Sequence, residues 1–131
     1  MKVHKQLSIF LENKPGTLAR VSGALAARRI NILGLSIMDA VDHGVVRMVV
    51  SNPVQAAHLL GEGGMMVVES DVLALDLPDK PGALARLAEK LSKARVNIEY
   101  AYGTTGRAGS KSQVIVKVDN LQRARRALGR S

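Results

Sequence analysis

The sequence predicts an α+β protein built by duplication of one small unit. The first observation is a repeated segment: residues 13–20 read NKPGTLAR and residues 79–86 read DKPGALAR. The second is that flanking positions keep the same offset of 66 residues (79 minus 13), as Leu25 and Leu91 do. The third is a switch from period-two to helical apolar spacing across each copy. An in-register repeat of this length indicates duplication and not chance.

Residues 1–70 are expected to form the first unit. Residues 5–11 alternate between apolar and polar side chains, as a half-buried strand does. The Pro-Gly pair at 15–16 then turns the chain into a helix that ends near Arg29. The remaining predicted elements are two strands joined by a hairpin, a helix that Pro53 opens, and a last strand, at residues 32–38, 45–50, 53–60 and 65–70.

Residues 71–131 are expected to form the second unit, with strands and helices at residues 72–77, 83–95, 98–102, 113–118 and 121–128. The order of elements is the ferredoxin-like βαββαβ plan, an antiparallel sheet with two helices on one face. Each unit is near the lower size limit for folding alone, so the two should pack together or share a sheet. After residue 128 the sequence leaves no room for a last strand of the second unit, which predicts an open edge at residues 72–77.

The composition favours a cytoplasmic protein with no membrane segment. The chain has no cysteine, no secretion signal, and no apolar run near the ~20 residues that cross a bilayer. The net charge of +8 is uneven, because residues 103–131 hold seven Lys or Arg against the single acid Asp119. Such a segment suits an anionic partner or simply keeps the protein soluble.

The repeated motif resembles the ACT domain, the amino-acid-binding regulatory module of metabolic enzymes and regulators. A strand and a Lys-Pro-Gly loop lead into a helix, and the segment Arg-Ile-Asn-Ile at 29–32 returns as Arg-Val-Asn-Ile at 95–98. Because both copies show the pattern, the resemblance covers nearly the whole chain. The chain is most similar in this respect to small stand-alone proteins with two ACT units in tandem.

The loop and the helix start suit a free amino acid on chemical grounds also. Gly16 has no side chain, so a ligand can come close to the backbone. The N–H groups of the first helical turn and the positive end of the helix dipole suit a carboxylate. Asn13 and Asn31 each bring a donor and an acceptor, which can hold an ammonium or a polar side chain. Singly, each residue also fits ordinary turn and cap chemistry, so the prediction depends on their recurring together.

In ACT domains that resemble this one, the ligand lies between two units and touches the loop of one and the second-strand start of its neighbour. The resemblance therefore implies six binding positions in each copy. These are Asn13, Gly16, Thr17, Leu18, Asn31 and Ile32 in the first copy, and Asp79, Gly82, Ala83, Leu84, Asn97 and Ile98 in the second.

The two predicted sites are not equal. Asp79 stands where the first copy has Asn13, and its carboxylate would repel a ligand carboxylate while attracting an ammonium. Ala83 lacks the hydroxyl of Thr17, so we expect the first copy to bind more tightly. Leu11 stands where some serine-binding ACT domains have a histidine, which argues against serine as the ligand.

Other chemistries are disfavoured. His4, His43 and His58 have no second ligand at metal spacing, and no nucleophile with a paired base is evident, so neither a metal, a cofactor nor an enzymatic activity is predicted. Residues 103–112 resemble a phosphate loop in composition only. Gly and Lys are not adjacent there and a strand follows in place of a helix, so a mobile hairpin loop is expected.

The rival function is binding of RNA or another polyanion, because RNA-recognition domains share the ferredoxin-like plan and this chain is basic. Those domains stack bases on aromatic residues, for which only Tyr100 and Tyr102 are available. The arginines at 123, 125, 126 and 130 fit a solvated helix face better than a phosphate track. Nucleic acid is therefore the less favoured partner.

These observations favour a non-enzymatic regulatory protein that binds a small amino acid at the interfaces of its units. It would pass the bound state to a protein partner, which requires that the ligand prefer one arrangement of the units. The open edge expected at residues 72–77 predicts a homodimer or a higher homo-oligomer, because an exposed apolar edge is usually covered.

Overall fold

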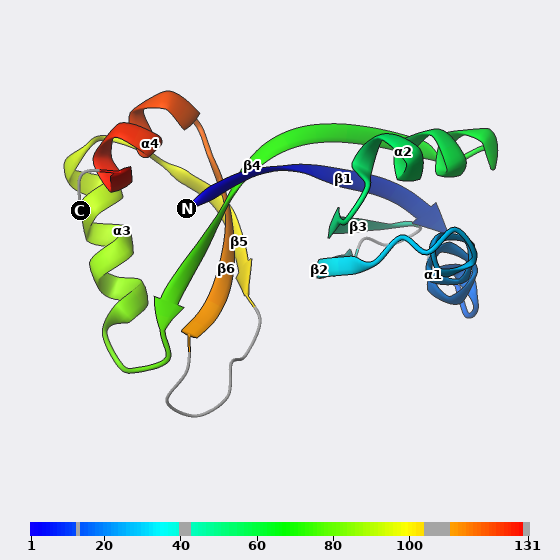
Figure 1. Cartoon of the computed structure of the whole chain (residues 1–131), viewed down its shortest axis with the longest axis horizontal. Coiled ribbons are helices and arrows are strands. Elements are labelled where there is room, and N and C mark those ends of the chain that lie inside the picture. Colours follow the sequence, from blue (N-terminus) through cyan, green and yellow to red (C-terminus); the bar gives the residue numbers. More distant parts are fainter. Residues whose placement is uncertain (13, 40–42, 104–110, 130–131) are drawn as a thin grey trace. The chain divides into compact units, whose positions relative to one another are not determined.

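The computed structural model describes residues 1–12, 14–39, 43–103 and 111–129 (Figure 1). Within these residues it has the predicted α+β fold, with six strands and four helices. The chain forms two compact units. We call Lys5–Ser70 the first unit, and Met1–His4 together with Asp71–Ser131 the second unit. The domain boundaries expected from the sequence, residues 1–70 and 71–131, stay a prediction.

The first unit has the ferredoxin-like order of elements. They are β1 (Lys2–Glu12), α1 (Thr17–Ala27), β2 (Ile32–Asp39), β3 (His43–Val50), α2 (Pro53–Glu62) and β4 (Met66–Pro78). The strands lie side by side in the order β2-β3-β1-β4, and β3 runs antiparallel to both β1 and β2. Because β1 and β2 are both antiparallel to β3, they are parallel to each other. The end of β1 and the start of β2 therefore lie at opposite ends of this sheet.

The core of the first unit is aliphatic, as the composition predicts. Leu7 and Ile9 of β1 are fully buried and pack in one cluster with Val21 and Leu25 of α1 and Leu60 of α2. Full burial of one such side chain stabilises a fold by about 1.5–3 kcal/mol. This cluster fixes α1, and hence the loop before it, against the sheet.

The second unit repeats the plan. β4 is followed by α3 (Ala83–Lys93), β5 (Ile98–Gly103), β6 (Lys111–Val118) and α4 (Leu121–Gly129). The strand order is β1-β4-β6-β5, with β6 antiparallel to β4 and β5. Figure 1 shows α3 and α4 on the same side of these strands. Leu73 of β4, Leu91 of α3 and Ala124 of α4 are fully buried in the shared core.

The start of β1 stands in place of the missing strand of the second unit. No strand follows α4 in the described residues, as predicted. β1 neighbours β4 in the sheet, and Met1–His4 belong to the second unit. The predicted open edge at residues 72–77 is therefore wrong where β1 lies beside β4, and Val72 and Leu73 are fully buried. A local alternation pattern does not show which distant strand supplies the pairing, so the sequence could not reveal this arrangement.

The two loops that carry the repeated motif fold alike. Gly16 precedes α1 with φ of 87°, and Gly82 precedes α3 with φ of 90°. The other end of each helix also matches, because Arg29 and Arg95 are left-handed, with φ of 58° and 59°. The repeat thus extends to the backbone conformation at both ends of the helix.

Candidate functional site

The start of α1 follows a left-handed glycine. Gly16 is the residue before the helix, no described side chain caps the first turn, and that turn contains no acidic residue. A Cβ atom on Gly16 would meet nothing within 4 Å, so the approach to the backbone is open. Thr17 is only 6% exposed, and its hydroxyl donates to the Lys14 carbonyl at 3.0 Å. Thr17 therefore holds the loop in shape.

The start of α3 has the same backbone with different side chains. It also lacks a side-chain cap and an acid in its first turn. A Cβ on Gly82 would lie 3.1 Å from Arg86 Nη1, so a guanidinium stands beside this loop. Ala83 is buried, whereas Leu84 is 57% exposed and Asp79 is also exposed. The second loop thus presents a carboxylate, a guanidinium and an uncovered leucine.

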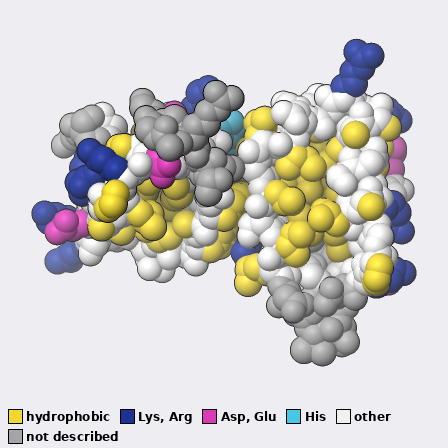
Figure 2. All heavy atoms as spheres, turned by 90° about the horizontal axis from the view of Figure 1, so that it is seen from below, with side chains coloured by type: hydrophobic (Ala, Val, Ile, Leu, Met, Phe, Trp, Pro, Cys, Tyr) yellow, Lys and Arg dark blue, Asp and Glu magenta, His cyan; other side chains and the backbone are white. Residues whose placement is uncertain are grey.

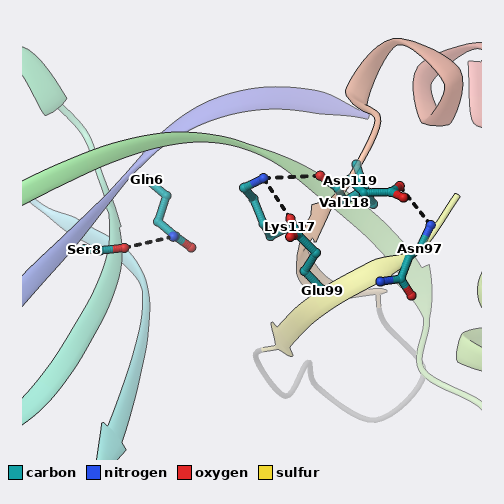
Figure 3. Close-up of polar contacts among 7 residues, drawn as sticks. All are labelled: Gln6, Ser8, Asn97, Glu99, Lys117, Val118 and Asp119. Atoms are coloured by element: carbon teal, nitrogen blue, oxygen red, sulfur yellow. Dashed lines mark hydrogen bonds and ion pairs between the residues drawn. The ribbon is translucent and has the colours of Figure 1, made fainter.

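Asn31 and Asn97 lie away from these loops within each unit. Asn31 N–H donates to Ser51 Oγ at 2.9 Å, and Asn97 N–H donates to Asp119 Oδ1 at 2.9 Å. In Figure 3 the side chain of Asn97 points away from Asp119. Ile32 and Ile98, which follow these asparagines, are half-buried against the two cores. Each asparagine is separated from the loop of its own unit by a helix of 11 residues, about 16 Å long.

Within one unit the structure therefore does not bring together the loop before the helix and the asparagine after it, which are the two predicted halves of a site. A ligand that touches a loop and a strand start needs two units, as the resemblance implies, and this stays a prediction. Asn13 lies outside the described residues, as do residues 104–110 of the predicted hairpin loop and the hairpin turn at 40–42.

A hollow opens beside the start of α3 in the second unit. Its volume is ≈ 340 Å³, and two of the predicted residues, Asp79 and Leu84, line it. The other lining residues come from the end of β4 and its loop and from strands β5 and β6: Leu77, Pro78, Lys80, Ala101, Tyr102, Gly103, Ser112 and Val114. The walls are largely apolar, and Asp79 and Lys80 bring one charge of each sign.

The first unit has a smaller hollow in a different place. It measures ≈ 180 Å³ and lies between the loop before α1 and the turn that follows α2, with Thr17, Arg20 and Gly64 in its lining. Glu12 and Lys14 also line it and form an ion pair of 3.0 Å. The hydrogen bond and the charge of Lys14 lower the pKa of Glu12 from its usual value. Of the five predicted positions of the first copy that the structure describes, only Thr17 lines this hollow.

Arginines gather on α4 beside the N-terminus. Arg125, Arg126, Gln122 and Met1 line a hollow of ≈ 430 Å³ in the second unit. Two guanidinium groups and an amide form a surface that suits an anion. Tyr100 and Tyr102, the aromatic residues of the rival prediction, lie on the other face of the sheet, in register with Lys117 and Ile115. The arginines and the tyrosines therefore do not form one continuous surface for a nucleic acid.

Two ion pairs and the character of the helices complete the description of the polar groups and the surface. His58 lies on an exposed face of α2, with Nε2 3.0 Å from Glu62 Oε1. Lys117 Nζ donates to Glu99 Oε1 at 3.1 Å across β5 and β6 (Figure 3). Among the described helices, none combines the length and apolar character needed to cross a membrane.

The structure is a duplicated ferredoxin-like fold with a left-handed glycine before the first helix of each copy. The chain belongs to the family of ACT domain pairs, whose model matches residues 1–129. A search of curated protein sequences finds no match.

Solved structures share the fold over nearly the whole chain. Protein BT0572 from Bacteroides thetaiotaomicron is 37% identical, with a TM-score of 0.92, over 98% of this chain and 88% of that one. The ligand-free regulatory subunit of aspartate kinase from Thermus thermophilus is 18% identical, with a TM-score of 0.73, over 99% and 97%. The corresponding subunit from Thermus flavus is 20% identical, with a TM-score of 0.66, over 98% and 94%. The two kinase subunits establish similarity of fold alone.

Proposed function

We propose that this protein is a non-enzymatic regulator that binds a free amino acid at its ACT units and passes the bound state to a protein partner. The observation that carries the proposal is the duplicated helix start. In both units a left-handed glycine precedes a helix whose first turn has neither a side-chain cap nor an acid among the described residues. This arrangement suits the carboxylate that every amino acid carries.

The remaining groups suit the rest of an amino acid. An ammonium needs oxygen acceptors, and the side chains of Asn31, Asn97 and Asp79 are on exposed residues at the predicted positions. Asp79 together with Arg86 gives the second loop one group of each charge for a zwitterion. We propose that both loops bind, with unequal affinities because these side chains differ.

The proposed output is regulation of an enzyme of amino-acid metabolism. The membership of this chain in the family of ACT domain pairs, together with the resemblance of its motif to a regulatory module of metabolic enzymes, supports a partner of this kind. A bound ligand changes such a partner only through a difference in affinity between two arrangements of the units.

We also propose a homodimer in the cytoplasm. The edge that first suggested a dimer has β1 as a neighbour of β4, so β2 offers a better reason. Leu33, Leu35, Ile37 and Met38 of this strand are 41%, 41%, 54% and 49% exposed. Exposed apolar side chains are visible as yellow groups in Figure 2. Exposed apolar side chains on an edge strand are usually covered by another chain. A strictly monomeric mass by light scattering at high concentration would contradict this part of the proposal.

A thermal-shift panel of the twenty amino acids tests the proposed function. A ligand present at 100 times its Kd should stabilise the protein by about 2.7 kcal/mol, which is a rise of several degrees in Tm for a chain of this size. The matched controls are the N-acetylated and amidated forms of each amino acid that responds, because they lack the two charges. If no amino acid raises the Tm at millimolar concentration, the proposed function is wrong.

A further inference from the structure

We propose that the hollow beside α3 is the amino-acid site of the second unit and that it selects an amino acid with an apolar side chain. This inference rests on the proposed function and deepens it. The hollow is defined above by its lining residues and its volume of ≈ 340 Å³. That volume is at the small end of the range for ligand pockets, which suits a single amino acid better than a nucleotide.

Two residues of β5 that line the hollow are small where β2 carries large ones. Gly103 pairs with Val114 in the second unit, and Ile37 pairs with Val46 in the first. Val114 and Val46 are themselves equivalent, because they pair with Leu75 and Ile9, which are 66 positions apart. Gly103 is therefore the counterpart of Ile37.

By the same register, Ala101 is the counterpart of Leu35. Ala101 pairs with Val116 and Leu35 with Met48, on the helix-covered face of each sheet. The second unit thus has two small residues where the first has large aliphatic side chains, at the edge beside the helix start.

The exposure of the helix residues agrees with this loss. Leu84 at the start of α3 is 57% exposed, whereas its counterpart Leu18 at the start of α1 is half-buried. An exposed leucine over a partly apolar floor of Leu77 and Val114 is surface that a ligand side chain can cover. Burial of a leucine-sized side chain there favours binding by about 10- to 100-fold over a ligand without one.

The charged groups of the hollow fit the common part of an amino acid. Asp79 and Lys80 line it and are both exposed, so they can meet an ammonium and a carboxylate at the mouth. Arg86, which lies beside Gly82, adds a second cation next to the helix start. For an apolar amino acid the second unit therefore becomes the tighter site, opposite to the order predicted from Asn13 and Thr17.

Titration calorimetry with leucine, methionine, alanine, serine and aspartate tests the proposal. The parent protein should bind leucine or methionine at least about tenfold more tightly than alanine or serine. Ala101→Leu and Gly103→Ile import the residues of the first unit and fill the hollow, so each should weaken leucine binding at least about tenfold. Ala26→Leu adds the same volume at an exposed position of α1 and should leave the affinity unchanged.

Two measurements keep the result decisive. Thermal melts of Ala101→Leu and Gly103→Ile show whether the variants fold, and Asp79→Asn removes the proposed ammonium partner without adding volume. If serine or aspartate binds and leucine and methionine do not, the selectivity is wrong while the proposed function stands. If leucine binds and neither the filled hollow nor Asp79→Asn weakens it, the location is wrong. If no amino acid binds the parent, both proposals fail.

Discussion

The edge strands of the two units have the same register and opposite surfaces. β2 of the first unit presents Leu35 and Ile37 as exposed apolar side chains. β5 of the second unit has Ala101 and Gly103 at the equivalent positions, beside a hollow. The backbone at both helix starts is nearly identical, with φ of 87° and 90° at the two glycines. The two units therefore share one backbone fold, and they differ in the side chains of one edge strand and in what those side chains can contact.

Equivalent substitutions in the two cores should cost similar amounts of stability. Leu25 and Leu91 are equivalent and both fully buried. We expect Leu25→Ala and Leu91→Ala each to lower the free energy of unfolding by about 2–5 kcal/mol, since both leave a cavity. Urea denaturation measures both. A loss from one variant that exceeds the other by more than about 2 kcal/mol would show that the two cores are not equivalent.

The start of β1, Met1–His4, should stabilise the second unit only. Deletion of residues 2–4 removes the part of β1 that belongs to the second unit, next to β4, so we expect a loss of about 1–3 kcal/mol in local stability there. Hydrogen exchange should show faster exchange at the amides of β4 in the second unit and no change in β3. Lys2→Ala keeps the backbone and is the matched control. Unchanged protection after the deletion would mean that the start of β1 does not complete the second unit.

Substitutions of the two loop glycines distinguish backbone strain, which both share, from steric crowding, which only Gly82 has. Gly16→Ala should cost about 1–2 kcal/mol, because a left-handed φ is unfavourable for a residue with a Cβ. Gly82→Ala should cost the same or slightly more, because its Cβ would meet Arg86 Nη1 at 3.1 Å and displace that side chain. Thermal unfolding of both variants checks this. A substitution at Gly16 without cost would contradict the left-handed loop.

The smallest expected effect is a pH dependence confined to the first unit. Lys14 lowers the pKa of Glu12, and Pro78 at the equivalent position of the second unit carries no carboxylate. Since the folded pKa is lower than the unfolded one, the stabilisation is present above the unfolded pKa and is lost as the pH falls through the folded pKa. NMR titration should give Glu12 a midpoint below the ordinary glutamate value, and Lys14→Ala should restore it. An ordinary midpoint in the parent would contradict the pair.

The repeat made most of the fold predictable. The alternation at residues 5–11 and the helical spacing after the Pro-Gly turn depend on local burial, and the structure confirms both. The pairing of Met1–His4 with the second unit was missed, because register between distant strands leaves no local signal. The hollow was also missed, although comparing Leu35 and Ile37 with Ala101 and Gly103 at the same offset would have revealed it.

The most direct test of the account is an NMR titration of the methyl groups with leucine. The account predicts that the methyls of Leu84 and Ala101 shift with a common Kd, while those of Leu18, Leu35 and Ile37 respond only at higher ligand concentration. Saturable shifts that appear first, or only, in the first unit would contradict the claim that the two edges of this duplicated protein have different binding roles.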